Sequence, residues 1–269
     1  MAKGLVRFLF RFLGTCLTHQ VPRAAAQISF YLLFSVFPLL LVLVACVGLF
    51  RLEVEAVMEV IARLSPVAED VLGEYVAYVV GNESPGLMAA GSVMAISASS
   101  AAFRGLMRIT GEVSGRPAFR GVAMFGVSLV MSFVLLLIIF AFLLAMVTGR
   151  WFLTLLMGGL PINALARLWQ WLRFPVVFSL GVLAITAVYR VCLSPKALPG
   201  ARAWPGAVLA SVGLVVGTGV FSLFLSLSTR YSLVYGSLAN IMLLMLYFFL
   251  CGNILVAGSV FNCLRGSRL

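Results

Sequence analysis

The sequence predicts an all-α integral membrane protein that forms a single domain over residues 1–269. Hydrophobic residues make up 63% of the chain and charged residues only 10%, and the mean hydropathy is +1.14. Crossing a bilayer core of about 30 Å takes roughly 20 apolar helical residues, and six stretches are of that kind. We therefore expect six transmembrane helices, at 27–50, 86–103, 121–148, 169–189, 206–228 and 236–261.

The first of these spans also carries polar and helix-bending residues. Gln27, Tyr31 and Ser35 recur every four residues, and Pro38 returns close to the same face. Unpaired polar atoms in hydrocarbon cost several kcal/mol. We therefore expect this face to turn toward other protein segments.

Residues 1–20 form a separate element before the first span. Apolar residues recur there at helical spacing, namely Leu5, Phe8, Leu9, Phe12, Leu13 and Cys16. Lys3, Arg7 and Arg11 share another face of the same helix. This pattern predicts a basic amphipathic helix that lies in the interface of an anionic leaflet, with its three basic residues at the membrane surface.

Residues 51–84 hold seven of the eight acidic residues of the chain and form two further apolar stripes. Ser65-Pro66 between the stripes is typical of a helix start, with an N-cap followed by proline. We expect a pair of amphipathic helices outside the membrane, covered by the membrane surface, by the bundle itself or by a protein partner.

Small residues mark two of the predicted spans. The span at 86–103 is dominated by Ala, Ser and Gly, which let helix backbones approach closely, so we expect it to be central in the bundle. In the fifth span, Gly213 and Gly217 have GxxxG spacing. That spacing suits close helix packing. It is compatible with a homo-oligomer but does not establish one.

The basic residues predict the orientation. If the N-terminus is inside, the N-terminal arm, the 104–120 and 190–202 connections and the C-terminus carry 13 of the 19 Lys and Arg residues. The outside segments carry the other six. Positive charge accumulates on the cytoplasmic side, so both termini are predicted to be cytoplasmic and residues 51–84 extracytoplasmic. Because the basic residues lie at the ends of apolar runs, we expect no nucleic-acid partner.

The chain offers little for catalysis. It has one histidine, His19, and five cysteines without a CxxC pair, so we expect neither a metal site nor a cofactor. Metal-dependent phosphodiester hydrolysis needs clustered His, Asp or Glu ligands, and metal-free cleavage needs a positioned acid–base pair. No such set is visible, so we expect no enzyme and assign no catalytic residues.

Three stretches resemble a known family. Residues 24–50, AAAQISFYLLFSVFPLLLVLVACVGLF, resemble the opening motif of the YihY/BrkB family of bacterial inner-membrane proteins. Leu198-Pro199 to Trp204-Pro205-Gly206 resembles its segment before the fifth span, and residues 231–262 resemble its closing motif. The family motif usually ends with an acidic residue near the last asparagine, and Gly258 to Asn262 has none. The resemblance implies a bacterial inner-membrane location. It does not imply ribonuclease activity, although members were historically named ribonuclease BN.

Two functions remain open. Helices rich in small residues, a proline within a span and sparse polar groups are features of bundles that move substrates. Seven residues are candidates for a polar path: Gln27, Tyr31, Ser35, Pro38, Asn240, Tyr247 and Asn253. Because no carboxylate lies deep in a span, a lipid or small amphiphilic solute is a better candidate than an ion-coupled cargo. Membrane lipids are then the expected partners. The alternative is a non-transporting envelope scaffold that binds an unidentified protein.

Overall fold

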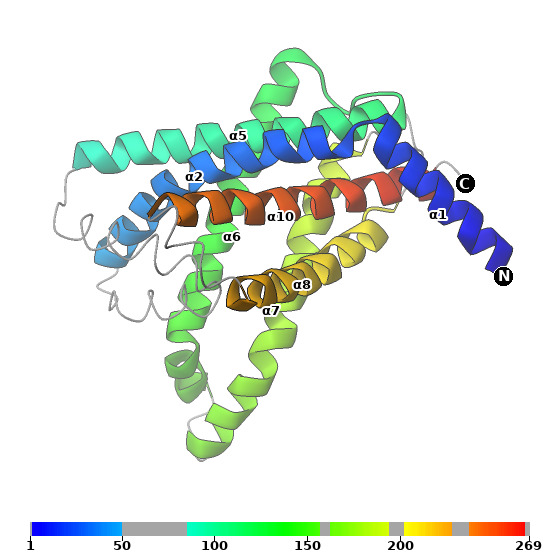
Figure 1. Ribbon diagram of the computed structural model, residues 1–269. Helices are drawn as coiled ribbons and strands as arrows, with labels where there is room; N and C mark the ends of the chain where they lie inside the picture. Colours follow the sequence, from blue (N-terminus) through cyan, green and yellow to red (C-terminus); the bar gives the residue numbers. More distant parts are fainter. Residues whose placement is uncertain (1, 50–84, 157–161, 194–201, 228–236, 267–269) are drawn as a thin grey trace.

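The computed structural model describes residues 2–49, 85–156, 162–193, 202–227 and 237–266 (Figure 1). The described residues form seven α-helices and no strand. They are α1 (Ala2–Thr18), α2 (Val21–Leu49), α5 (Pro85–Ser114), α6 (Gly121–Leu156), α7 (Ile162–Cys192), α8 (Trp204–Leu227) and α10 (Ser237–Gly266). The all-α class is confirmed, whereas the predicted helix pair at 51–84 lies outside the described residues.

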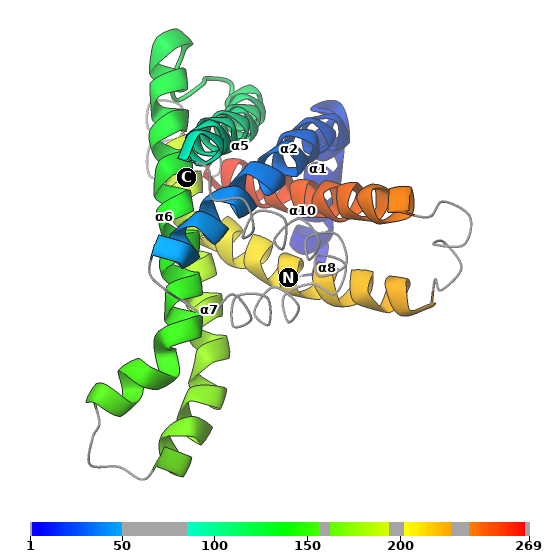
Figure 2. The same cartoon turned by 90° about the vertical axis from the view of Figure 1, so that its left-hand side faces the viewer.

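Four segments of the described helices are long and apolar enough to cross a membrane: Gly121–Ile138, Pro175–Cys192, Trp204–Leu227 and Ile241–Gly266. They belong to α6, α7, α8 and α10, the helices of the third to sixth predicted spans. Helices α2, α5, α8 and α10 run side by side, whereas the α6–α7 hairpin crosses them steeply (Figures 1 and 2). The structure therefore supports a membrane protein. Its described helices do not form one bundle of six parallel spans.

Several helices extend beyond the predicted limits. Helix α5 continues through Ser114, so Arg104 and Arg108 lie on a helix and not in a connecting loop, contrary to the prediction. Likewise α6 includes Arg150 and Trp151, and Arg190 lies in the last turn of α7. The prediction failed because it ended each helix where charge appears. Arginine is a good helix former, and glycine or proline is the stronger stop signal.

Small residues determine how α2 packs between α5 and α10. Ala25 of α2 is fully buried, and a Cβ at Gly252 of α10 would lie 2.9 Å from its carbonyl oxygen. On the other side, a Cβ at Gly105 of α5 would lie 3.2 Å from the Ile28 side chain. Helix α5 also packs against α6, α7 and α10. The small-residue helix is therefore central among the described elements, as its composition predicts.

Buried hydrogen bonds join α7, α8 and α10. The Asn262 side chain on α10 accepts a bond from the Gly206 N–H (2.7 Å) and donates one to the Ala203 carbonyl (2.8 Å). The Gly206 N–H lies in the first turn of α8, where backbone N–H groups lack a partner within the helix, and Ala203 directly precedes that turn. The Tyr189 hydroxyl of α7 donates to the Leu255 carbonyl of α10 at 2.6 Å. We call Tyr189, Ala203, Gly206, Leu255 and Asn262 the asparagine junction.

The turn between α5 and α6 folds back onto α5. Gly115 and Gly121 have φ angles of 76° and 55°, in the left-handed region that glycine enters without strain. A Cβ at Gly111 of α5 would lie 2.9 Å from the Pro117 Cα, so the turn rests directly on the helix. This geometry places the basic end of α5 next to the start of α6.

Candidate functional site

The predicted polar residues of the first span do not share one environment. Gln27 is exposed, Tyr31 is half-buried, and Ser35 is buried. The Ser35 hydroxyl donates to the Leu32 carbonyl of its own helix at 2.8 Å. Pro38 lies within α2, and its side chain is outside the described set. Of these four, Tyr31 lies near a charged group, Arg104 of α5.

The polar residues of α10 lie in different places. The Tyr247 hydroxyl is 3.1 Å from the Thr218 hydroxyl of α8. The Asn253 amide donates to the Phe249 carbonyl of its own helix at 2.8 Å. Asn240 belongs to α10, with a side chain outside the described set. The structure therefore does not gather the described candidates into one cluster.

The glycines of the fifth span pack within the chain. A Cβ at Gly213 would lie 2.8 Å from the Ile254 side chain of α10, and a Cβ at Gly217 would lie 2.9 Å from it. This close approach of α8 and α10 is the kind of contact that small-xxx-small spacing allows. It occupies the GxxxG face of α8 without a second copy of the chain.

Helix α1 contacts the end of α10 and leaves part of its surface free. Phe12 and Cys16 pack against the core, and burial raises the pKa of the Cys16 thiol. Arg7 and Arg11 are exposed, and Leu13 is also exposed. The side chain of Lys3 is outside the described set. An exposed apolar and basic surface is compatible with the interfacial position that the sequence predicts.

A site that sequence reasoning missed surrounds Arg104 on α5. The guanidinium Nη1 donates to the Ser100 hydroxyl of α5 and, at 3.2 Å, to the Ser128 hydroxyl of α6. Ser128 donates to the Phe125 carbonyl at 2.8 Å, so Ser100 is the donor in the 2.7 Å contact between the two serines. The guanidinium also lies over the Phe125 ring, 5.1 Å from its centroid, in a cation–π contact. We call Tyr31, Ser100, Arg104, Phe125 and Ser128 the arginine site.

The charge of Arg104 has no anionic partner among the described residues. No ion pair joins residues in the described ranges, where Glu112 is the single acidic side chain. Tyr31 of α2 and Arg108 of α5 are close enough to interact electrostatically with Arg104. A guanidinium beside apolar helices that has no carboxylate partner in the described ranges is therefore a candidate for binding an anion.

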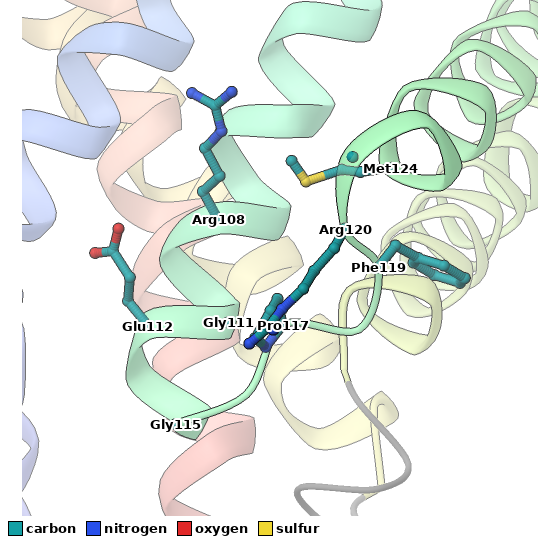
Figure 3. Close-up of a pocket in the computed structure, with 9 residues that line it drawn as sticks. Arg108, Gly111, Glu112, Gly115, Pro117, Phe119, Arg120 and Met124 are labelled. Atoms are coloured by element: carbon teal, nitrogen blue, oxygen red, sulfur yellow. The ribbon is translucent and has the colours of Figure 1, made fainter.

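An open hollow lies beyond the arginine site, where α5 turns into α6 (Figure 3). Its volume is about 420 Å³. Arg108 and Glu112 project from successive turns of α5, and Arg120 reaches toward Gly111 and Pro117 (Figure 3). The remaining lining residues are Gly115, Phe119, Gly121 and Met124. The hollow therefore combines two cations and one carboxylate with an apolar wall.

Comparisons with known proteins address the identity of the chain. A sequence profile of the family described as "Virulence factor BrkB" matches residues 12–268. The chain belongs to the BrkB virulence-factor family. This BrkB-family chain is 25% identical over 255 residues to the ribonuclease-like protein YfkH of Bacillus subtilis (strain 168), an alignment that covers 93% of this chain and 92% of YfkH. No solved structure matches it.

The family resemblance drawn from the three sequence stretches is thus confirmed. The word ribonuclease in the name of YfkH describes that relative. In the described part of this BrkB-family chain, no three His, Cys, Asp or Glu side chains gather into a metal-binding group. The unusual polar feature of the described helices is the arginine site. A clue to it was present in the sequence, because residues 92–103, directly before Arg104, contain no glycine or proline that would end the helix.

Proposed function

We propose that this BrkB-family protein moves a lipid or a small amphiphilic solute across a membrane. The observation that carries the proposal is the arginine site, where a fixed cation that has no carboxylate partner among the described residues lies between apolar surfaces. Phe30 and Phe34 of α2 are 45% and 54% exposed, and Phe125 of α6 is 51% exposed. An amphiphile presents the complementary pair of surfaces, a polar head and an apolar tail.

Reconstitution in liposomes tests this function. Purified protein is incorporated into vesicles that contain a labelled lipid, and a separate set is loaded for uptake of labelled amphiphilic solutes. We expect faster movement of label across the bilayer than in protein-free vesicles, and slower movement for Arg104→Gln. Arg265→Gln is the matched control, because Arg265 is an exposed arginine at the end of α10. Equal rates with and without protein would refute transport and favour the scaffold.

We further propose that the protein resides in the bacterial inner membrane with both termini in the cytoplasm. The distribution of basic residues supports this orientation, with 13 of 19 on the predicted inner segments. In a variant without native cysteines, Glu69→Cys should react with an impermeant thiol reagent in intact spheroplasts. Ser114→Cys, at the end of α5, should react only after lysis. The reverse pattern would invert the orientation.

A further inference from the structure

We propose that Arg104 binds the headgroup of the transported amphiphile and that this headgroup carries a phosphate. The inference rests on the proposed function for its physiological meaning, and it concerns a binding step that is measurable without transport. The site comprises Arg104, its two serine partners and Tyr31, at the place where α2 and α6 both pack on α5.

The guanidinium is held in place before any ligand binds. A guanidinium offers five N–H donors in a planar fork that matches the oxygens of a phosphate or a carboxylate. In Arg104, Nη1 is occupied by Ser100 and Ser128, and the plane is supported by the Phe125 ring. The other donors make no hydrogen bond to a residue in the described ranges. Because the side chain is already ordered, binding sacrifices little of its conformational freedom.

Neighbouring groups favour phosphate over carboxylate. Tyr31 of α2 is close enough to interact electrostatically with Arg104, and Arg108 lies one helical turn further along α5. A phosphate presents several free oxygens on a tetrahedral centre, so it can accept from Arg104 and from a second donor in a different direction. A carboxylate has two oxygens in one plane, and a single bidentate guanidinium already engages both of them. The arrangement therefore suits a ligand with more than two acceptor atoms.

The hollow at the α5–α6 turn extends this basic surface. Arg108 and Arg120 line it, and Glu112 opposes them with one negative charge (Figure 3). The three charges sum to a positive value, which attracts an anionic headgroup toward the end of α5. From there Arg108 leads to Arg104, where the exposed phenylalanines of α2 and α6 are available to acyl chains.

A purely structural role for Arg104 makes different predictions. In that case the guanidinium serves only to connect α5 to α6 through Ser100 and Ser128. Arg104→Gln retains an amide donor and removes the charge, whereas Arg104→Lys retains the charge and removes the planar fork. If Arg104 has this structural role alone, each variant should lose thermal stability in proportion to the hydrogen bonds it lacks. A phosphate site predicts changes in affinity that follow charge and fork geometry.

Direct binding to detergent-solubilised protein separates these possibilities. The probes are short-chain phosphatidic acid and phosphatidylglycerol, phosphatidylcholine of the same chain length, a fatty acid and inorganic phosphate. We expect the parent to prefer the two anionic phospholipids over the fatty acid. Affinity for them should fall at least tenfold in Arg104→Gln, less in Arg104→Lys and about threefold in Arg108→Gln. Arg265→Gln should leave it unchanged.

Each outcome decides a specific point. Equal affinity of the parent and Arg104→Gln for the anionic phospholipids refutes the site. Tighter binding of the fatty acid than of phosphatidic acid, lost in Arg104→Gln, refutes the preference for phosphate. Displacement of bound lipid by inorganic phosphate identifies the phosphate itself as the ligand, and its failure identifies the lipid. If Arg104→Gln does not fold, Arg104→Lys carries the test, because it retains the charge without the planar fork and should bind the anionic phospholipids more weakly than the parent. Parental affinity in Arg104→Lys would then refute the contribution of the fork.

Arg104-dependent binding without movement of label in vesicles would refute the transport function and leave the binding site intact. Conversely, lipid movement that Arg104→Gln does not slow would refute the binding site and leave transport intact. The two proposals therefore fail separately.

Discussion

The asparagine junction and the arginine site are both polar clusters among apolar helices, and they differ in how their hydrogen-bonding groups are satisfied. At the junction, both polar atoms of the Asn262 amide bond backbone groups at the start of α8 and directly before it, and the residue is 1% exposed. At the arginine site, a half-buried cation is held by two hydroxyls and faces no carboxylate in the described ranges. Polarity within a membrane protein is therefore insufficient to mark a functional site.

The two clusters differ in whether their polar groups have all their hydrogen-bond partners, and this difference distinguishes a structural cluster from a candidate binding site. A fully bonded, fully buried cluster fixes helix positions, because leaving one of its partners unpaired costs about 1–3 kcal/mol. A preordered group with spare donors contributes less to folding and remains available to a ligand. This contrast predicts that substitutions at the junction chiefly reduce stability, whereas substitution of Arg104 chiefly reduces binding.

The largest effect is expected from Gly206→Ala at the junction. The added Cβ would overlap the Gly258 carbonyl oxygen and come within 2.5 Å of the Asn262 side chain. Neither neighbour can retreat, because one is helix backbone and the other is held by two hydrogen bonds. We expect a loss of more than about 3 kcal/mol, above the usual range for overpacking, measured by thermal unfolding in detergent.

Gly219→Ala is the matched control on the same helix. A Cβ there would meet no atom within 4 Å, so α8 should accept it without loss of stability. Equal stability of the two variants would show that α8 and α10 are not in close contact at Gly206.

The second effect is expected from Asn262→Ala. This change leaves the Gly206 N–H without its side-chain partner, whereas the Ala203 carbonyl still accepts from the Ala207 N–H at 3.3 Å. An unpaired buried group costs about 1–3 kcal/mol, while polar contacts between membrane helices average about 0.6 kcal/mol. We therefore expect a loss of about 2 kcal/mol in the free energy of unfolding.

Asn253→Ala on the same helix provides the comparison. Among the described residues its amide bonds the Phe249 carbonyl of α10 itself, so its removal should cost well under 1 kcal/mol. If Asn253→Ala were as damaging as Asn262→Ala, the bonds to α8 would not be the source of the stability.

Smaller stability effects are expected along the predicted polar path. Gln27→Ala, Tyr31→Phe and Asn240→Ala should each unfold within about 0.6 kcal/mol of the parent, the typical cost of one polar contact in a membrane bundle. The path hypothesis predicts that each nevertheless reduces lipid or solute movement in vesicles. Full activity in all three variants would remove these residues from the path, and loss in Tyr31→Phe alone would restrict the path to the arginine site.

The all-α fold class could be predicted from the sequence because it depends on local composition. Long apolar runs with proline at their starts define helices without reference to the rest of the chain, as at Pro85 of α5. Helix ends were less predictable, since Arg104 and Arg108 are charged and still continue α5. A charge marks where a span leaves the membrane, whereas the helix itself ends only at the left-handed Gly115.

The two clusters themselves depend on contacts between distant residues. Asn262 bonds Gly206, 56 positions away, and Arg104 bonds Ser128, 24 positions away. A single sequence shows periodicity within a helix but not which helices become neighbours. For this reason Asn262 was seen only as part of a motif, and Arg104 was assigned to a connection.

No loss of stability is expected at Ser211 of α8, which tests directly whether a hydrogen-bond partner decides what a buried polar group contributes to stability. Ser211 is 5% exposed, and its hydroxyl has no hydrogen-bond partner among the described residues. Removing an unsatisfied buried hydroxyl eliminates a desolvation cost without breaking a bond, so Ser211→Ala should be neutral or stabilise by up to about 1 kcal/mol. Ser128→Ala removes a hydroxyl of similar burial that accepts from Arg104 and Ser100, and it should be destabilising. Thermal unfolding of the two variants in the same detergent gives the difference. A loss above about 1 kcal/mol in Ser211→Ala would mean that this hydroxyl has a hydrogen-bond partner in the membrane. Ser211 would then be a bonded polar group like Asn262, and the contrast between bonded and unbonded groups would fail at this position.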